Sequence, residues 1–268
     1  TIAHSAEEAH KALDDAMQKK IFGSAGTKVV IEDFLQGEEA SFIVLCDGKK
    51  TIPFASSQDH KARDNNDLGP NTGGMGAYSP APIVTEEIHK QVMEKIIKPT
   101  IDGLKSEGIT YKGFLYAGLM IKNSEISVLE FNCRFGDPET QPILMRMESD
   151  LAEICLLAAQ GNLNEREISW TKDSALGVVI ASKGYPFEYE KNKEINNLEN
   201  ENPRQKVFHA GTKTQEGKVL SNGGRVLCVT ALGSTLLDSK NLAYQKVKNI
   251  DWKDGFYRDD IGDKAIKS

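Results

Sequence analysis

Polar side chains of four types directly follow an apolar segment, and together they suit chemistry on a phosphate. Residues 126–129 lead into Glu130, Asn132, Arg134 and Asp137. Side chains on a strand alternate between its faces, so Glu130 and Asn132 point the same way. Neighbouring carboxylate and amide oxygens suit a hard cation such as Mg²⁺, which takes few protein ligands and completes its shell with water and phosphate. Arg134 could grip a phosphate or a carboxylate through two hydrogen bonds. The run indicates chemistry on a nucleotide phosphate.

The helices and strands expected around this run predict an α+β protein. Helical periodicity and capping residues predict helices over 5–19, 85–108, from 137 onward, over 150–161 and over 234–248. Alternating or β-branched runs predict strands over 28–35, 39–46, 51–54, 113–122, 124–132, 175–182, 207–212, 218–220 and 225–232. Turn residues at 47–48 and at Asn123 predict two hairpins. Leu237 and Leu242 are expected to face inward from the last helix, and a domain boundary is expected between residues 172 and 173.

Two stretches show no regular period. Residues 56–82 are polar, and glycines are concentrated between positions 69 and 76. We expect a loop here, and a loop of this length in a compact domain is more often functional than idle. Residues 188–205 are charged and rich in asparagine, and they predict a solvated excursion.

Composition excludes several classes of protein. Of the 268 residues, 39% are apolar and 27% are charged, which is typical of a soluble globular chain. The net charge of −6 makes the surface a poor match for nucleic acid. No apolar run approaches the ~18 residues that a membrane span needs. The four cysteines are scattered without zinc-site spacing, so we expect a reducing, cytoplasmic setting.

Several longer runs resemble one family of ligases. They are 57–61 (SQDHK), 69–80 (GPNTGGMGAYSP), 113–118 (GFLYAG), 134–141 (RFGDPETQ), 208–212 (FHAGT), 222–230 (NGGRVLCVT) and 260–262 (DIG). Together, and in this order, they resemble the glycinamide ribonucleotide synthetase family over essentially the whole chain. Several long motifs in register are far more specific than any one of them.

The resemblance implies a fold and a reaction. The family belongs to the ATP-grasp superfamily, in which two α+β subdomains clasp ATP. The chain is then a partial ATP-grasp catalytic domain over 1–172, followed by a small C-terminal α/β domain over 173–268. The implied substrates are ATP, glycine and 5-phosphoribosylamine, with Mg²⁺ or Mn²⁺. Glycine's carboxylate attacks the γ-phosphate to give glycyl phosphate, and the sugar amine then displaces phosphate. A monomer or a dimer fits this interpretation, with no nucleic-acid or membrane partner.

The resemblance also implies which residues bind the metal and the nucleotide. Glu130 and Asn132 would hold the cation. An acidic ligand that many ATP-grasp enzymes carry on the preceding strand corresponds to Gly118 here, which leaves the third protein ligand open. Backbone groups near Glu32 and Leu35 would bond the adenine. Glu39 would hold the ribose hydroxyls, with Glu38 as the competing candidate.

Substrate contacts are implied for the glycine-rich stretch and its surroundings. Lys61, Arg134 and Asp137 would act on the reacting groups, whereas His60 reads as structural. Asp137 has a second explanation, because aspartate before proline is a favoured helix start. The remaining substrate-binding candidates are Asp59, Asn71, Gly73, Gly74 and Arg225. Arg225 could instead be only part of a hairpin turn.

The chain departs from the family pattern at its start. Family members begin with a Rossmann-like domain and a phosphate loop on the mobile lobe, and neither motif is present here. We therefore expect a partner in the missing N-terminal portion of the same enzyme. Two alternatives stay open: another ATP-grasp ligase of purine synthesis, and a non-catalytic nucleotide-binding fragment.

The isolated 268-residue chain is expected to show little or no ligase activity, because half of the ATP clasp is missing from it. The measurement is ATP- and glycine-dependent amide formation by the purified chain, and robust formation would contradict the expectation.

Overall fold

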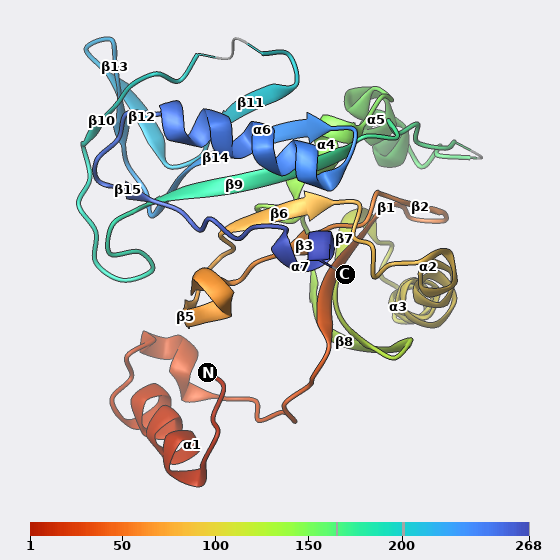
Figure 1. Ribbon diagram of the computed structural model, residues 1–268. Coiled ribbons are helices and arrows are strands. Elements are labelled where there is room, and N and C mark those ends of the chain that lie inside the picture. Colours follow the sequence, from red (N-terminus) through yellow and green to blue (C-terminus); the bar gives the residue numbers. More distant parts are fainter. Residues whose placement is uncertain (165, 200–201, 268) are drawn as a thin grey trace. The chain divides into compact units, whose positions relative to one another are not determined.

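The computed structural model describes residues 1–164, 166–199 and 202–267 (Figure 1). The chain forms two compact units, Thr1–Gly37 and Glu38–Ser268. Among the described residues, no helix combines the length and the apolar character needed to cross a bilayer.

The first unit is helical. Helix α1 (Ala6–Leu13) is capped by Ser5, whose side chain accepts from the Glu8 amide, and a π-helical turn (Asp14–Gln18) extends it. A 3₁₀ turn (Gly23–Thr27) follows. The predicted helix over 5–19 is confirmed.

The predicted strand over 28–35 is wrong. None of the described residues 1–37 belongs to a strand, so the apolar run 28–35 has no neighbour within its unit to satisfy a ladder of hydrogen bonds. Its Val30 and Ile31 side chains are exposed.

The second unit opens with a four-stranded antiparallel sheet in the order β2-β1-β7-β8. Its strands are β1 (Glu38–Asp47), β2 (Thr51–Pro53), β7 (Lys112–Lys122) and β8 (Glu125–Asn132). The Asp47 carboxylate accepts from the amides of Lys49 and Lys50 at the first turn. Asn123 and Ser124 adopt positive φ at the second turn. Both predicted hairpins are confirmed.

Helices cover both faces of this sheet. Helix α2 (Glu86–Val92), a π-helical turn (Met93–Ile97) and α3 (Lys98–Ser106) run on from one another after the Thr85 cap, and their buried side chains pack against one face. Helix α5 (Leu151–Gln160) begins at the Asp150 cap, ends at left-handed Gly161, and packs against the other face. These helices match the predicted segments.

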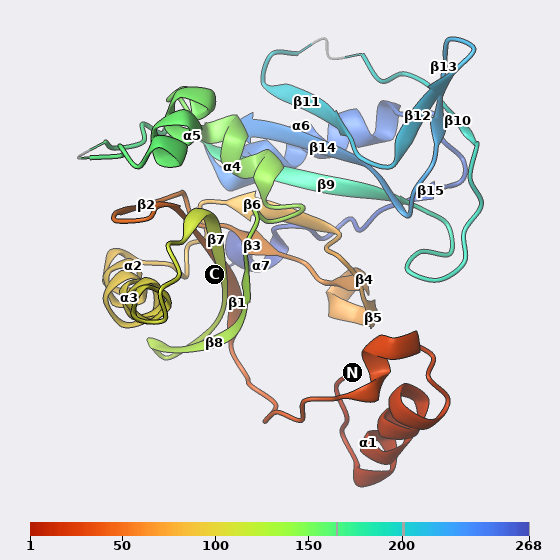
Figure 2. The same cartoon turned by 180° about the vertical axis from the view of Figure 1, so that it is seen from behind.

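A six-stranded sheet fills the rest of the unit in the order β11-β14-β9-β6-β3, with β15 also paired to β9. The strands are β3 (Gln58–Asp59), β6 (Gly76–Ser79), β9 (Ser174–Ser182), β11 (Gln205–His209), β14 (Arg225–Gly233) and β15 (Gly255–Phe256). Figure 1 shows α6 (Leu236–Asn249) across one face, and Figure 2 shows α4 (Thr140–Arg146) on the other.

The prediction of a loop without strands over 56–82 is wrong. Besides β3 and β6, this stretch holds β4 (Ala62–Asp64), a 3₁₀ turn (Asn65–Asp67) and β5 (Leu68–Asn71). Strands of two to four residues are too short to show a period of two in the sequence. Because β6 pairs with β9, one sheet runs across the proposed boundary between 172 and 173. That boundary stays a prediction.

Smaller elements complete the chain. Strands β10 (Glu194–Ile195), β12 (Thr212–Gln215) and β13 (Lys218–Ser221) form a three-stranded sheet, and α7 (Asp263–Lys267) lies near the end. Ile195 is buried, so the described part of the stretch 188–205 is not solvated throughout; residues 200–201 lie outside the description. Leu237 is 49% exposed, and the prediction that it faces inward is wrong, whereas Leu242 packs against the core.

Two leucines predict a contrast in stability. Leu176 on β9 is fully buried in the cluster beneath α6, so Leu176→Ala should lower the free energy of unfolding by about 2–5 kcal/mol. Exposed Leu237→Ala is the matched control and should cost under about 0.5 kcal/mol. Urea unfolding of both variants measures the difference, and equal losses would contradict this assignment of the core.

Candidate active site

The ammonium group of Lys61 stands between two carboxylates from different strands. Its Nζ atom lies 3.7 Å from Glu39 Oε2 on β1 and 3.6 Å from Glu130 Oε1 on β8. Burial by itself would lower the pKa of this ammonium, but the carboxylates outweigh burial and raise the pKa above its ordinary value. Lys61 therefore stays charged at neutral pH and partly neutralises both acids.

Glu130 lies over a neighbour that has no side chain. It pairs with Gly118 on β7, and a Cβ atom at Gly118 would lie 3.1 Å from Glu130 Cγ. The β7–β8 register shifts between Gly118 and Leu119, and such irregularities re-aim side chains. From Glu130 to Asn132 the pairing is regular, so these two side chains share a face.

The donor atoms of Glu130 and Asn132 fit a hard divalent cation. Both supply oxygen, and the Glu130 side chain is 50% exposed, so a ligand can approach it. Across the described residues, no group of three or more His, Cys, Asp or Glu side chains could hold a metal ion unaided. A cation here would take its remaining ligands from water and phosphate, as Mg²⁺ usually does in proteins.

Two further acids act on Lys61: Glu139, which is buried, and Asp59, which is half-buried. The Ser41 hydroxyl donates to Glu139 Oε1 at 2.7 Å, and Ser41 Oγ lies 3.0 Å from the Tyr116 hydroxyl. Burial, and then the Glu139 charge, raise the pKa of Asp59 well above its ordinary value. Sequence reasoning missed Glu139, Ser41 and Tyr116. Glu139 belongs to the motif over 134–141, but the helix expected to start at residue 137 was a sufficient explanation for it.

Arg225 joins three separate segments. Its Nη1 atom donates to the carbonyls of Gly73 (2.7 Å), Gly74 (3.3 Å) and Asp137 (2.9 Å). Its Nη2 atom lies 3.1 Å from Asp137 Oδ2. Arg225 therefore fixes the glycine-rich stretch against the turn before α4, and its contact with substrate stays a prediction.

The prediction that Asp137 starts a helix is wrong. Helix α4 begins at Thr140, its N-cap is Glu139, and residues 137–139 form a turn. The start of α4 has no side-chain cap bond, and the Asp137 carboxylate pairs with Arg225 instead. Arg134 is exposed, and its Nη1 atom donates to the Phe135 carbonyl at 2.9 Å, which leaves other guanidinium donors for a ligand.

Internal contacts hold the glycine-rich stretch. The Gly73 amide donates to the Tyr185 hydroxyl at 2.9 Å, and the Gly74 amide donates to Thr72 Oγ1 at 3.0 Å. Gly74 has φ +112°, and a Cβ there would lie 2.6 Å from Asp59 Oδ1, so only glycine fits. Asn71 ends β5 and is exposed. Substrate binding by Asn71, Gly73 and Gly74 stays a prediction, and so does that by Asp59.

The nucleotide candidates fall in both units. Glu32 and Leu35 belong to Thr1–Gly37, and the adenine assignment stays a prediction. Glu38 and Glu39 are consecutive on β1, so their side chains leave opposite faces. Glu39 is the one that meets Lys61, and the choice between them for the ribose stays open.

His60 is structural, as predicted. Burial, with a smaller effect of Arg258, lowers its pKa from 6.5 to about 4. Its Nδ1 atom lies 3.3 Å from the Gly76 carbonyl, and its Nε2 atom accepts from the Gly262 amide at 3.3 Å. These partners fit the neutral ring with the proton on Nδ1.

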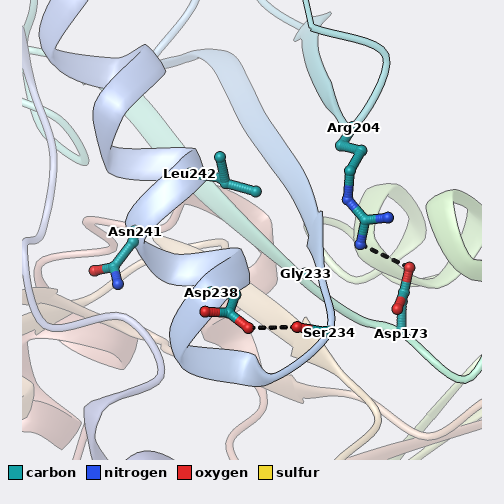
Figure 3. Close-up of a pocket in the computed structure, with 7 residues that line it drawn as sticks. All are labelled: Asp173, Arg204, Gly233, Ser234, Asp238, Asn241 and Leu242. Atoms are coloured by element: carbon teal, nitrogen blue, oxygen red, sulfur yellow. Dashed lines mark hydrogen bonds and ion pairs between the residues drawn. The ribbon is translucent and has the colours of Figure 1, made fainter.

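A separate hollow of about 540 Å³ lies at the start of α6 (Figure 3). It is lined by Asp173, Arg204, Gly233, Ser234, Asp238, Asn241 and Leu242. Arg204 pairs with Asp173 at 2.7 Å, and Ser234 donates to Asp238 at 2.6 Å, so its charged groups already have partners. None of the predicted site residues lines it.

The family model for the ATP-grasp (A) domain of phosphoribosylglycinamide synthetase matches residues 1–140, and the model for its C domain matches residues 175–264. The chain belongs to the phosphoribosylglycinamide synthetase family. The resemblance inferred from the motifs is confirmed, and so is the α+β fold class. The two matched regions leave 141–174 unassigned, which contains the proposed domain boundary.

Similar proteins carry matching names. The chain is 52% identical over 266 residues to the phosphoribosylamine–glycine ligase of Pasteurella multocida, and 55% identical over 267 residues to that of Allochromatium vinosum. In both cases 99% of this chain aligns, and it spans 62% of the relative's length.

Solved structures agree on the fold. The phosphoribosylamine–glycine ligase of Thermotoga maritima superposes with a TM-score of 0.82 at 32% identity, covering 94% of this chain and 63% of that one. The biotin carboxylase domain of Hydrogenobacter thermophilus 2-oxoglutarate carboxylase, solved with MgADP, gives a TM-score of 0.67 at 12% identity, covering 94% of this chain and 54% of its own. The second likeness shows the fold alone.

The lowered pKa of His60 predicts a pH dependence of stability. Between about pH 4 and 6.5 the unfolded chain binds a proton at His60 that the folded chain does not, so this stabilisation is complete above 6.5 and is lost as pH falls. From about pH 7 to 4.5 the loss should be on the order of 2–3 kcal/mol.

His60→Gln cannot take up this proton, so the stability gap between parent and variant should narrow by that amount on acidification. Urea unfolding across this pH range measures it. Exposed His10→Gln is the control and should follow the parent. A gap that does not change with pH would show that His60 is not held neutral.

Proposed function

We propose that the chain is the catalytic and C-terminal part of a phosphoribosylamine–glycine ligase. The reaction joins glycine to 5-phosphoribosylamine, with ATP converted to ADP and phosphate, in de novo purine synthesis. One observation carries the proposal: Lys61 stands within 3.7 Å of two acids, and one of them, Glu130, shares a strand face with Asn132. The family and the names of the relatives support it.

The chemistry needs positive charge, because a carboxylate anion must approach a triphosphate. The chain supplies Lys61, with a raised pKa, and the exposed guanidinium of Arg134. Preorganised cations at a developing charge are usually the largest contribution to such a rate. Glycine's carboxylate attacks the γ-phosphate to form glycyl phosphate, and the amine of 5-phosphoribosylamine then displaces phosphate to form the amide.

Glu130 and Asn132 would hold Mg²⁺ or Mn²⁺. Bound there, the ion would supply charge neutralisation at the phosphates. Their side chains bring one carboxylate and one amide, which fits an ion that arrives with a nucleotide.

Asp59 and Glu139 suit the substrate that carries positive charge. Together with Glu39 and Glu130 they make four acids, against two cations, Lys61 and Arg225, that act on Asp59. That excess favours an ammonium group, and glycine has one. Asp59, whose side chain packs beside Gly74, is the proposed contact.

Other readings of the same fold predict different results. Another ATP-grasp ligase of purine synthesis would accept a different amine, so a panel of amine substrates separates it from the proposed enzyme. A non-catalytic fragment would bind nucleotide without the metal dependence that Glu130 and Asn132 imply.

The free cysteines support the expected cytoplasmic setting, which stays part of the proposal.

Removing the Glu130 carboxylate tests the metal assignment. Glu130→Ala should weaken Mg²⁺-dependent ATP binding by more than about tenfold, because the ion loses its charged protein ligand. Titration calorimetry with Mg²⁺ and ATP measures this. Glu125→Ala removes an exposed acid from the same strand and should bind as the parent does. If Glu130→Ala bound Mg·ATP as tightly as the parent, the assignment would be wrong.

A further inference from the structure

The backbone around Lys61 is fixed by the glycine-rich stretch. The Thr72 amide donates to the Lys61 carbonyl at 2.7 Å, and the Thr72 hydroxyl donates to the same carbonyl at 2.9 Å. The His60 amide donates to Gly76 at 2.9 Å, and the Met75 amide donates to His60 at 2.8 Å. These hydrogen bonds hold the backbone of His60 and Lys61. The Ala62 carbonyl and the His60 Nε2 atom have their partners elsewhere in the chain.

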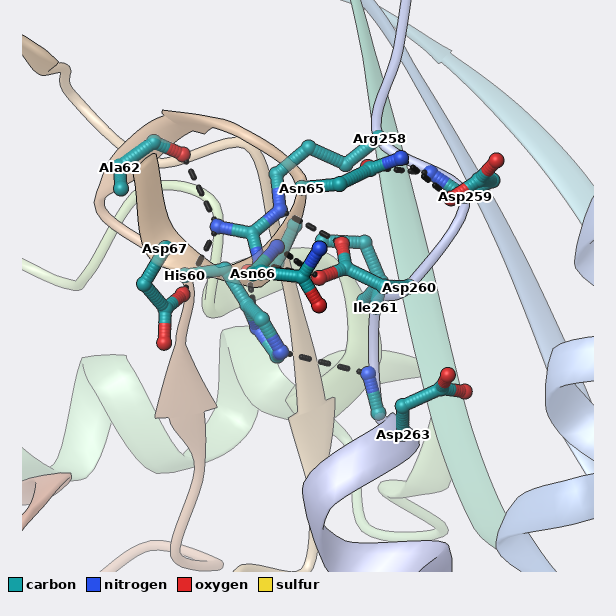
Figure 4. A network of polar contacts seen from close by, with 12 residues as sticks. His60, Ala62, Asn65, Asn66, Asp67, Arg258, Asp259, Asp260, Ile261 and Asp263 are labelled. Atoms are coloured by element: carbon teal, nitrogen blue, oxygen red, sulfur yellow. Dashed lines mark hydrogen bonds and ion pairs between the residues drawn. The ribbon is translucent and has the colours of Figure 1, made fainter. Parts of the chain in front are cut away.

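Arg258, close to the end of the chain, satisfies one of them. Its side chain is 2% exposed, and its Nη1 atom donates to the carbonyl of Ala62, directly after Lys61, at 3.0 Å. Nε and Nη2 each donate to the Asp260 carboxylate at 2.8 Å, and Nη1 lies 3.0 Å from Asp67 Oδ1. Figure 4 shows the guanidinium enclosed by these acceptors. A buried guanidinium with two carboxylates is held in one orientation.

His60, directly before Lys61, is held by the same terminal segment. Its Nε2 atom accepts from the Gly262 amide at 3.3 Å (Figure 4). The Asn66 amide donates to Asp260 Oδ2 at 2.8 Å, and the Asn65 side chain donates to Asp259 at 2.6 Å. Lys264 also pairs with Asp67. Residues 258–264 therefore contact the chain on both sides of Lys61.

We infer that the segment 258–264 positions Lys61 for the proposed reaction, with Arg258 and His60 as positioning residues. Lys61 Nζ meets its two acids at 3.6 and 3.7 Å, distances that a small backbone shift would change. Arg258 makes no ion pair with Glu39 or Glu130 among the described contacts, and its hydrogen bond to the Ala62 carbonyl ties it to the backbone next to Lys61. The inference rests on the proposed function, because only that function gives the position of the ammonium a catalytic consequence.

The first test is independent of nucleotide. Arg258→Gln should speed hydrogen exchange of the Thr72 and Met75 amides by about tenfold or more relative to the global rate, because local opening becomes easier. Arg146→Gln is the matched control: Arg146 is also buried, and it donates to Asp173, Ser79 and Thr171, not to the Lys61 segment. In Arg146→Gln, hydrogen exchange of the Thr72 and Met75 amides should change only as much as the global stability changes. Asp260→Asn, which is isosteric, provides the same measurement if Arg258→Gln does not fold.

The second test asks whether Arg258 acts through Lys61. Arg258→Gln should weaken Mg·ATP binding by about tenfold, but should add little to the loss caused by Lys61→Met, as coupled residues do. Arg258→Lys keeps the charge and one donor nitrogen, and it should restore part of the affinity. A residue that only stabilises the fold would give the same loss in both backgrounds.

The outcomes separate this inference from the function it rests on. Faster local exchange with non-additive losses supports it. Unchanged exchange at Thr72 and Met75, or additive losses, would overturn it. If the parent failed to bind Mg·ATP, the proposed function would fail as a description of this chain, and the exchange experiment would still decide whether 258–264 holds Lys61.

Discussion

Four carboxylates, those of Glu39, Asp59, Glu130 and Glu139, act on the single ammonium group of Lys61. Like charges near one another repel, and burial disfavours a charged carboxylate, so a site with this many acids resists further negative charge. The site responds in two ways. Burial, and then the Glu139 charge, raise the pKa of Asp59, and Glu130 stays half exposed, where water and a ligand can reach it. An acid-rich site of this kind favours metal ions and ammonium groups as ligands.

Holding these groups together requires the two large sheets to meet. Glu39 and Glu130 lie on the four-stranded sheet, whereas Asp59 ends β3 of the six-stranded sheet. The backbones of Ser41 and Ser57 exchange hydrogen bonds of 2.8 and 3.2 Å, which joins β1 to the residue before β3. Arg225 then ties the glycine-rich stretch to the turn before α4. Arg258 completes the arrangement from the other end of the chain, 196 residues from Ala62.

Local signals in the sequence were sufficient where the structure depends on local geometry. Asn123 marked a hairpin, Asp150 and Gly161 marked the two ends of α5, and alternation placed Glu130 and Asn132 on one face. Contacts over long distances left no such signal. Buried Glu139 accepts from Ser41, 98 residues away, and Arg258 donates to the carbonyl of Ala62, 196 residues away. The expected strand over 28–35 failed for the same reason, because a strand exists only with a partner.

Gly118 shows how the lack of a side chain shapes the metal chemistry of the proposed enzyme. A Cβ atom there would lie 3.1 Å from Glu130 Cγ, so Glu130 would have to shift by a few tenths of an ångström to admit a side chain. Because Gly118 has no side chain, Glu130 and Asn132 are the candidate ligands on this part of the sheet. An ion with only two side-chain ligands gains most of its shell from water and phosphate oxygens. In the proposed enzyme, the metal would therefore be bound tightly only as a complex with the nucleotide. Occupancy of the metal site would then depend on the presence of the phosphate that reacts.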